Sequence, residues 1–213
     1  MFPHVQVRCY IGGEEMSAPG ISRFDLVIAG VGGQGAILAS DIIGKAAVKE
    51  NMPVRAAETH GMAQRGGSVV NHIRLGCELG SMIPLKGADV LLALEPSEAL
   101  RYLEYLADDG IIIVNTDPIL PVTVTSGLCA YPDVGEIIST LREKRKVTAF
   151  NATEAAKEAG NAQSMNVVMV GAVSNYLPIS VDIMMECVRE LVPPKTIDIN
   201  IRAFEIGRSV AQG

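Results

Sequence analysis

The chain has 213 residues, of which 48% are hydrophobic and 20% charged, and its formal net charge is −6 at pH 7. A chain of this length fits one α/β domain with a sizeable core, and the acidic balance argues against a nucleic-acid-binding surface. No apolar run approaches the roughly 18 residues of a membrane span, and residues 1–20 lack the pattern of a secretory signal, so we expect a cytoplasmic protein. The high apolar fraction indicates either a large interface with a partner or a densely packed monomer.

The chain order alternates predicted strands with predicted helices. Residues 1–20 are expected to form a loose arm or a short extra strand, and residues 21–213 a single domain. Strands are predicted at 24–29, 52–58, 67–76, 88–95, 110–116 and 146–151, and helices at 35–50, 96–107, 133–144, 164–177, 181–192 and 196–210. The last segment also shows strand-like alternation, and its length favours a helix. The pattern predicts a three-layer α/β sandwich with a mostly parallel sheet, a Rossmann-like first βαβ unit and a helical C-terminal region.

Two details refine this plan. The strand at 52–58 is expected to be the second parallel strand, and Pro118 and Pro121 are expected to impose an extended loop.

The four cysteines, Cys9, Cys77, Cys129 and Cys187, are far apart and form no C-x-x-C pair. Local sequence therefore builds no metal or iron–sulfur site, and we expect buried, reduced thiols.

The run "GVGGQG" follows the first predicted strand and leads into the first predicted helix. Gly30, Gly32 and Gly35 satisfy the G-x-G-x-x-G pattern, while Gly33 and Gln34 add a close-approach position and a polar side chain. Backbone N–H groups at such a helix start bind phosphate or carboxylate groups. The alternative is that the glycines only let the helix pack on the strand. No Lys-Ser/Thr pair follows Gly35, which excludes an ATP-type P-loop.

Glu58 lies where a dinucleotide fold places its ribose-binding acid. A dinucleotide unit would continue from there into another crossover helix. Instead the chain enters "ETHGMAQRGGS", residues 58–68, a polar loop interrupted by glycines that leads directly to another strand. An NAD site is therefore the second interpretation.

The loop itself concentrates ligand-binding side chains. Arg65 suits bidentate recognition of an anion, and His60 can donate, accept or carry a proton near neutral pH. The ordinary alternatives are a structural salt bridge for Arg65, a turn cap for His60 and simple packing for Met62. No serine or cysteine lies in the setting of an activated nucleophile.

Four segments resemble a known family: "GVGGQG", "ETHGMAQRGGSVVNHIRLG", "ADVLLALEPSEALRYL" and "IIIVNTDPILP". They are similar to the gamma subunits or gamma domains of 2-oxoacid:ferredoxin oxidoreductases, and within these to the indolepyruvate:ferredoxin oxidoreductase beta subunits. The similarity runs from Phe24 to Gly207. "HGMAQRGGSV" is its most specific part.

The resemblance implies oxidative decarboxylation of an aryl 2-oxoacid to an acyl-CoA, with electrons passed to ferredoxin. Complexes of this family use thiamine diphosphate, Mg, [4Fe–4S] clusters and CoA as co-substrate. This chain has neither a thiamine motif nor clustered cysteines, so these cofactors are expected on a larger alpha subunit, in a hetero-oligomer that the family suggests is alpha2beta2. Indolepyruvate, phenylpyruvate and hydroxyphenylpyruvate are all compatible substrates.

The resemblance also implies where this chain would touch CoA or substrate. His60 and Arg65 are candidates to support catalysis without touching the reacting atoms. The candidate cofactor-binding residues are Gly30, Gly32, Gly33, Gln34, Gly35, Glu58, His60, Gly61, Met62, Gln64, Arg65, Gly66, Gly67 and Asn115. Two rival functions stay open: a stand-alone NAD(P)-linked oxidoreductase and a non-catalytic assembly module.

Overall fold

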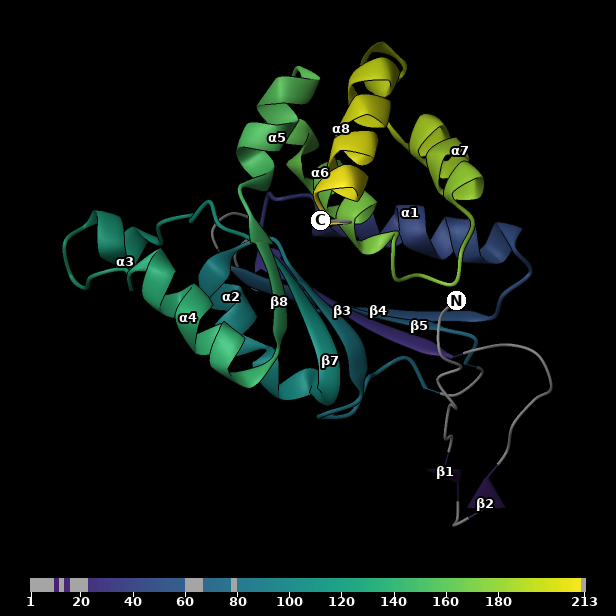
Figure 1. Cartoon of the computed structure of the whole chain (residues 1–213), viewed down its shortest axis with the longest axis horizontal. Helices are drawn as coiled ribbons and strands as arrows, with labels where there is room; N and C mark the ends of the chain where they lie inside the picture. The colour runs from purple at the N-terminus through teal and green to yellow at the C-terminus, as the bar shows by residue number, and fades with distance from the viewer. Residues whose placement is uncertain (1–9, 12–13, 16–22, 60–66, 78–79, 212–213) are drawn as a thin grey trace.

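A computed structural model describes residues 10–11, 14–15, 23–59, 67–77 and 80–211 (Figure 1). Its main sheet has six strands in the order β4-β5-β3-β6-β7-β8. The strands are β3 (Phe24–Val31), β4 (Val54–Thr59), β5 (Ser68–Leu75), β6 (Ala88–Ala93), β7 (Leu106–Asn115) and β8 (Lys146–Phe150). Strands β3, β6, β7 and β8 are parallel neighbours, and β5 pairs antiparallel with both β3 and β4.

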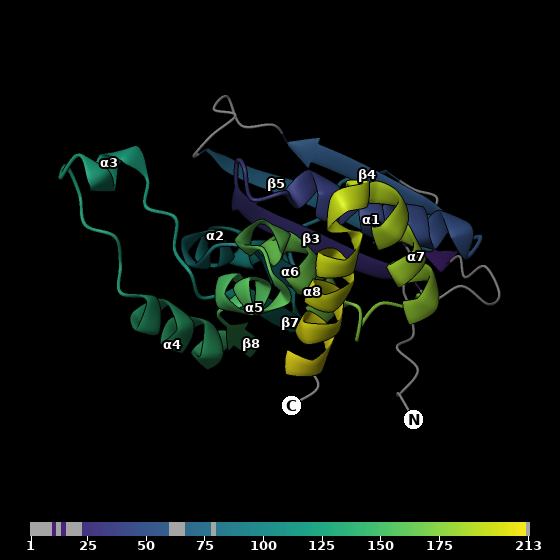
Figure 2. The same cartoon turned by 90° about the horizontal axis from the view of Figure 1, so that it is seen from above.

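Helices cover both faces of this sheet, which gives three layers (Figures 1 and 2). One face carries α1 (Ala36–Lys49), α5 (Ala152–Ala159), α6 (Met165–Val173), α7 (Val181–Leu191) and α8 (Ile197–Val210); the other carries α2 (Pro96–Arg101) and α4 (Val134–Lys144). Short 3-10 turns occupy Leu103–Tyr105, Ala162–Ser164 and Pro194–Thr196. The predicted fold class, with its mostly parallel sheet and helical C-terminal region, is confirmed.

Side-chain alternation along β3 separates two hydrophobic cores. Leu26 and Ile28 pack into the core shared with α1 and the C-terminal helices, whereas Val27 and Ala29 pack into the core shared with α2 and α4. All four side chains are fully buried. A strand covered on both faces reads as a continuous apolar run, which explains the unbroken "LVIA" of the sequence.

The expectation that residues 52–58 form the second parallel strand holds for the direction of the strand, but the strand has no parallel neighbour. Strand β4 runs in the same direction as β3, but β5 lies between them and β4 pairs antiparallel with β5. Only residues 60–67 connect β4 to β5, and a parallel connection needs a crossover of a dozen or more residues. The first βαβ unit is therefore Rossmann-like in strand direction and not in strand adjacency.

Two further boundaries differ from the prediction. Helix α2 ends at Arg101, and β7 begins at Leu106, four residues before the predicted start of that strand at 110. The proline segment after β7 contains a short helix, α3 (Val122–Thr125), where an extended loop was expected. Near the N-terminus, β1 (Tyr10–Ile11) and β2 (Glu14–Glu15) form a separate antiparallel pair, and the division of the chain at residue 20 stays a prediction.

Candidate functional site

The parallel strands β3, β6 and β7 end side by side at one edge of the sheet, here called the carboxyl edge. The segments that follow them there are residues 32–35, residues 94–95 and residues 116–121. Ligands of open α/β sheets bind outside the carboxyl ends of the strands. The glycine loop identified in the sequence is therefore in the position where a site is expected.

The glycine loop presents backbone N–H groups at the start of α1. Gly33 and Gly35 have positive φ angles of 101° and 78°, a left-handed geometry that favours glycine. Gly35 is the N-cap of α1, without a side-chain cap and without an acidic residue in the first turn. Among the described residues, none accepts a hydrogen bond from the N–H groups of Gly33 or Gly35. These donors, beside the positive end of the helix dipole, suit an anionic group.

The other two N–H groups of the loop are used by the chain itself. Gly32 donates to the carbonyl oxygen of Gly67 at 2.8 Å, and Gln34 donates to that of Val31 at 3.1 Å. The first of these bonds joins the glycine loop to the end of the second polar loop. His60, Gly61, Met62, Gln64, Arg65 and Gly66 lie outside the described residues, so their predicted roles stay predictions.

The side chain of Gln34 is buried, and its amide group is used in hydrogen bonds within the chain. Its Oε1 accepts from the N–H of Val31 at 2.8 Å, and its Nε2 donates to the carbonyl oxygen of Leu94 at 2.8 Å. The side chain therefore ties the glycine loop to the end of β6. A direct contact between Gln34 and a cofactor stays a prediction that these bonds do not support.

Two of the loop glycines are closely packed against neighbouring side chains. A Cβ on Gly30 would lie 2.9 Å from Gln34 Oε1 and 3.1 Å from Leu94 Cβ, and a Cβ on Gly35 would lie 2.4 Å from Asn166 Nδ2. Gly33 differs, because nothing lies within 4 Å of its Cβ position. The packing interpretation thus accounts for Gly30 and Gly35, and the open position is Gly33.

Asn115, at the end of β7, supports the same edge from within. Its Nδ2 donates to Leu94 O at 3.1 Å, and its Oδ1 accepts from the N–H groups of Asp117 at 3.2 Å and Ala152 at 3.0 Å. The side chain is 1% exposed. Its predicted contact with a cofactor stays a prediction, and its observed bonds position three neighbouring segments.

Glu95 is a fully buried carboxylate at this edge that sequence reasoning missed. It caps α2 through the N–H of Glu98 at 3.1 Å, and it accepts from Ser97 Oγ at 2.6 Å and from the hydroxyl of Tyr131. Burial and the bond to Glu95 raise the pKa of Tyr131 well above its usual value, so that this hydroxyl remains a donor. The signal in the sequence was a Glu directly after a buried strand and before the helix-starting Pro96.

The second polar loop is anchored at its C-terminal end, at Gly67 and Ser68. The hydroxyl of Ser68 bonds to the carboxylate of Glu98, on α2, and lies 3.0 Å from the hydroxyl of Tyr102. Glu98 also accepts from Arg101 Nε at 3.1 Å. Together with the bond from Gly32 to Gly67, these contacts fix the end of the loop against the carboxyl edge.

Glu58 lies on β4, opposite Asn71 of β5. Strand β5 therefore separates its strand from β3, which carries the glycine loop. In a dinucleotide-binding unit the strand with the ribose-binding acid adjoins the glycine-loop strand. The topology departs from that plan, as the loop after Glu58 had indicated.

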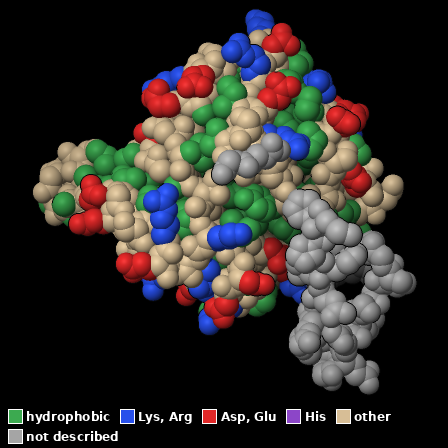
Figure 3. Space-filling view, viewed as in Figure 1, with side chains coloured by type: hydrophobic (Ala, Val, Ile, Leu, Met, Phe, Trp, Pro, Cys, Tyr) green, Lys and Arg blue, Asp and Glu red, His purple; other side chains and the backbone are tan. Residues whose placement is uncertain are grey.

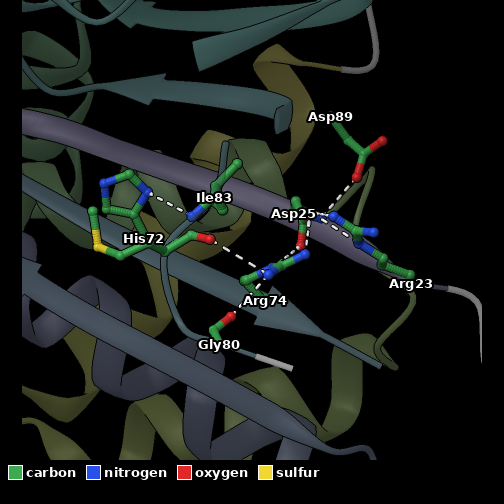
Figure 4. Close-up of polar contacts among 8 residues, drawn as sticks. Arg23, Asp25, His72, Arg74, Gly80, Ile83 and Asp89 are labelled. Carbon is green, nitrogen blue, oxygen red and sulfur yellow. Dashed lines mark hydrogen bonds and ion pairs between the residues drawn. The ribbon is translucent and has the colours of Figure 1, made fainter. Parts of the chain in front are cut away.

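A second polar cluster lies near the start of β3, at the opposite end of the strand from the glycine loop. Figure 4 shows its contacts. Asp25 and Arg74 form a buried ion pair of 3.0 Å across β3 and β5, and Arg23 also pairs with Asp25. Arg74 continues to the carbonyl oxygen of Gly80 at 2.8 Å. Asp89 accepts from the N–H of Asp25 at 2.7 Å, and its burial raises its pKa to about 6.

His72 extends this cluster toward the sheet interior (Figure 4). Its Nδ1 accepts from the N–H of Ile83 at 3.3 Å, and its ring packs edge-on against Tyr105. Burial, and secondarily the charge of Arg74, lowers the pKa of His72 below its usual value. The bonds within the cluster join β3, β5 and the segment before β6, which marks it as a structural element of the sheet.

Within the described ranges, no group of three or more His, Cys, Asp or Glu side chains is arranged to hold a metal ion. The described cysteines are free thiols, of which Cys77 and Cys187 are buried. Cys129 is exposed, which corrects the expectation of burial. In the same ranges, no helix has the length and apolarity required to cross a membrane.

The fold and the glycine loop at the carboxyl edge are consistent with one protein family. Residues 25–210 match the family of pyruvate ferredoxin/flavodoxin oxidoreductases, and the chain belongs to that family. Its fold is similar to the gamma subunit of keto/oxoacid ferredoxin oxidoreductase from Geobacter sulfurreducens, with a TM-score of 0.65 at 24% identity over 89% of this chain and 98% of that one.

Within the family, the chain is similar to indolepyruvate oxidoreductase subunits. It is 44% identical to subunit IorB of Archaeoglobus fulgidus, over 89% of this chain and 96% of the relative. It is also 44% identical to IorB of Thermococcus kodakarensis, over 90% of this chain and 98% of the relative. The resemblance inferred from the loop motifs is confirmed.

A further structural neighbour is a longer protein. It is the 2-oxoglutarate:ferredoxin oxidoreductase from Magnetococcus marinus with 2-oxoglutarate, coenzyme A and succinyl-CoA bound. The TM-score is 0.68 at 21% identity, over 89% of this chain and 31% of that one. The same fold there forms one part of a polypeptide about three times as long.

Proposed function

We propose that this chain is the accessory subunit of a 2-oxoacid:ferredoxin oxidoreductase that oxidatively decarboxylates an aryl 2-oxoacid, with indolepyruvate as the first candidate. The observation that carries the proposal is the 42–44% identity, over nearly the whole chain, to four relatives named as indolepyruvate oxidoreductase subunit IorB. Phenylpyruvate and hydroxyphenylpyruvate are the alternative substrates.

In this proposal the reactive cofactors belong to a larger alpha subunit. Thiamine diphosphate with Mg would supply the carbanion chemistry, and [4Fe–4S] clusters would carry electrons to ferredoxin. The four cysteines of this chain are far apart in the sequence and form no C-x-x-C pair, which supports this division of labour. An alpha2beta2 assembly in the cytoplasm completes the proposal.

The contribution of this chain is an anion-binding edge. The N–H groups of Gly33 and Gly35 have no acceptor among the described residues and lie at the uncapped start of α1. They suit the phosphate groups of CoA or the carboxylate of the 2-oxoacid. Arg65 would add a fixed positive charge from the neighbouring loop.

Gly33→Ala tests this role, because the new methyl group meets no atom within 4 Å but occupies the open side of the loop. Gly160→Ala is the matched control: its φ of 122° imposes a similar backbone strain, and it lies at the C-cap of α5. Both variants should lose about 1 kcal/mol of stability. In the reconstituted complex, with indolepyruvate and a viologen dye as acceptor, only Gly33→Ala should raise the apparent KM for CoA or indolepyruvate. Equal apparent KM values for the two variants would show that the glycine loop does not bind an anionic group of CoA or indolepyruvate.

Arg65→Ala tests the second loop in the same assay. Loss of the anion-binding charge should weaken the binding of CoA or indolepyruvate by about tenfold to a hundredfold, because a charge-assisted hydrogen bond contributes about 1.5–3 kcal/mol. Loss of assembly instead would show that Arg65 is structural. Micromolar binding of NADH to the isolated chain, measured by calorimetry, would favour the dinucleotide alternative.

A further inference from the structure

The segment between β7 and α4 projects from the body of the protein as an arm, residues 118–131, with α3 at its outer end (Figures 1 and 2). Its sequence, "PILPVTVTSGLCAY", contains no charged residue, in a chain that is 20% charged. Every residue from 119 to 130 is exposed except the half-buried Val124.

Large apolar side chains concentrate on this arm. Val122 and Leu128 are each 80% exposed, Leu120 is 50% and Ile119 is 39% exposed. Four of the nine large hydrophobic residues exposed in the described part of the chain therefore lie on ten consecutive positions. The space-filling view shows hydrophobic side chains along this projection, at the left (Figure 3). A concentration of exposed apolar side chains of this kind is typical of an interaction site.

Both ends of the arm are hydrogen-bonded to the same buried side chain, Glu95. At one end the N–H of Ile119 donates to Glu95 Oε1 at 3.4 Å, and at the other end the hydroxyl of Tyr131 bonds to the same oxygen. Glu95 itself is fully buried at the carboxyl edge. Within the arm, Leu128 donates to the carbonyl oxygen of Thr123 at 2.9 Å, and Thr125 to that of Pro121 at 3.0 Å. An internally bonded arm on a fixed stem loses little conformational freedom when it binds.

From these observations we infer that the arm is the docking element that seats this chain in an apolar groove of the larger, thiamine-carrying subunit. The inference rests on the proposed function. The arm leaves the same sheet edge as the glycine loop, so a subunit that completes the site at that edge also reaches the arm. The absence of charge on the arm matches an apolar groove, as in obligate interfaces, and not an acidic or basic surface.

The comparison structures favour a large partner over a second copy of this chain. In the Magnetococcus marinus enzyme the fold occupies 31% of its polypeptide, so the remaining part of that polypeptide is available to pack against it. The relatives of this chain are likewise named as subunits. A second copy of this chain is the competing occupant, and the test must distinguish the two.

The test replaces Val122 and Leu128 together by aspartate and measures the Kd for the large subunit of the same organism by biolayer interferometry. The matched control is Val48→Asp with Leu85→Asp, which changes the same residue types at exposed positions, 59% and 58%, outside the arm. The arm variant should raise Kd by on the order of thirtyfold or more, since residues at an interface centre contribute most of the binding energy. The control should leave Kd within about threefold.

Each outcome decides the matter. An unchanged Kd for the arm variant overturns the inference. The inference is also overturned if the arm variant no longer self-associates in light scattering but still binds the large subunit as the wild type does, because the arm would then bind a second copy of this chain. Both arm residues are highly exposed, so the variant should keep its circular dichroism spectrum and melting temperature; unfolding would show that the arm serves this chain's own fold and would also overturn the inference. The milder pair Val122→Ser and Leu128→Ser should weaken binding in the same direction. If the wild-type chain itself fails to bind the large subunit, the proposed function fails instead.

Discussion

Gln34 donates a hydrogen bond from Nε2 to the carbonyl oxygen of Leu94 at 2.8 Å, and so connects the glycine loop to the end of the adjacent strand β6. Asn115, from β7, donates to the same oxygen at 3.1 Å. The carbonyl group at the end of β6 thus accepts hydrogen bonds from two side chains, one that follows β3 and one at the end of β7. The N–H groups of Gly33 and Gly35 are held in place by this arrangement.

Replacement of Gln34 should destabilise the chain. Gln34→Ala removes two buried hydrogen bonds and leaves the N–H of Val31 without its acceptor, so we expect a loss of about 2–3 kcal/mol in the free energy of unfolding. Gln34→Glu keeps the acceptor but places a carboxylate oxygen against the Leu94 carbonyl, and should be at least as damaging at neutral pH. Urea denaturation measures both. A Gln34→Ala variant with wild-type stability but weakened CoA binding would show that the side chain serves the ligand.

The buried pair of Asp25 and Arg74 predicts a large stability effect. Asp25→Ala leaves two arginines, Arg23 and Arg74, without their shared carboxylate. Removal of one partner from a buried ion pair costs about 3–5 kcal/mol. The control Lys157→Ala breaks the exposed pair with Glu154 and should change stability by less than about 0.5 kcal/mol. Equal losses for the two variants would contradict a structural role for the cluster.

Asp89 predicts a pH dependence of stability. Its pKa of about 6 in the folded chain exceeds the ordinary value of 3.8, because burial disfavours the carboxylate and the charge of Asp25 adds to this effect, although the N–H of Asp25 opposes it. The folded state thus binds the proton more tightly than the unfolded state, and the stability that this proton contributes is lost as the pH rises from about 4 to about 6.

Asp89→Asn removes this titration and can still accept the N–H of Asp25. Relative to the wild type, the variant should therefore gain about 1–3 kcal/mol in the free energy of unfolding between pH 4 and pH 7.5. Urea denaturation at the two pH values measures the change. A difference between variant and wild type that is the same at both pH values would refute the raised pKa.

The fold was largely predictable because the strands are buried on both faces. Continuous apolar runs such as residues 24–29 identify central strands without any knowledge of their neighbours. The antiparallel pairing of β4 with β5 was missed because residues 52–58 were expected to form the second parallel strand of a Rossmann-like first βαβ unit. The eight-residue connection from Thr59 to Ser68 already excluded a parallel crossover.

The candidate site was predictable in place and less so in detail. Its glycines could be located from sequence, because positive φ and close packing require glycine. The role of Gln34 could not, since its partner Leu94 is sixty positions away in the chain. The hydrogen bonds of Glu95 with Ser97 and Tyr131 likewise depend on the tertiary fold, and no local pattern encodes them.

The crossing of α6 and α8 depends on two glycines that face the opposite helix. A Cβ on Gly171 would lie 2.1 Å from the carbonyl oxygen of Phe204, and a Cβ on Gly207 would lie 1.8 Å from that of Val168. Such distances cannot be relieved by a rotamer change, because the obstructing atoms are backbone. The two helices therefore approach as closely as they do only because both positions lack a side chain.

Gly171→Ala or Gly207→Ala should consequently lower the free energy of unfolding by about 3 kcal/mol or more, through forced separation of a packed core. Gly44→Ala is the matched control, since Gly44 lies in the interior of α1 with nothing within 4 Å of its Cβ position. That variant should gain about 0.5–1 kcal/mol, because alanine loses less backbone entropy than glycine on folding. Thermal and urea denaturation of the three variants measure these changes in the free energy of unfolding, which should have opposite signs for the helix-crossing variants and the control. A Gly171→Ala variant as stable as the wild type would show that α6 and α8 are further apart than described.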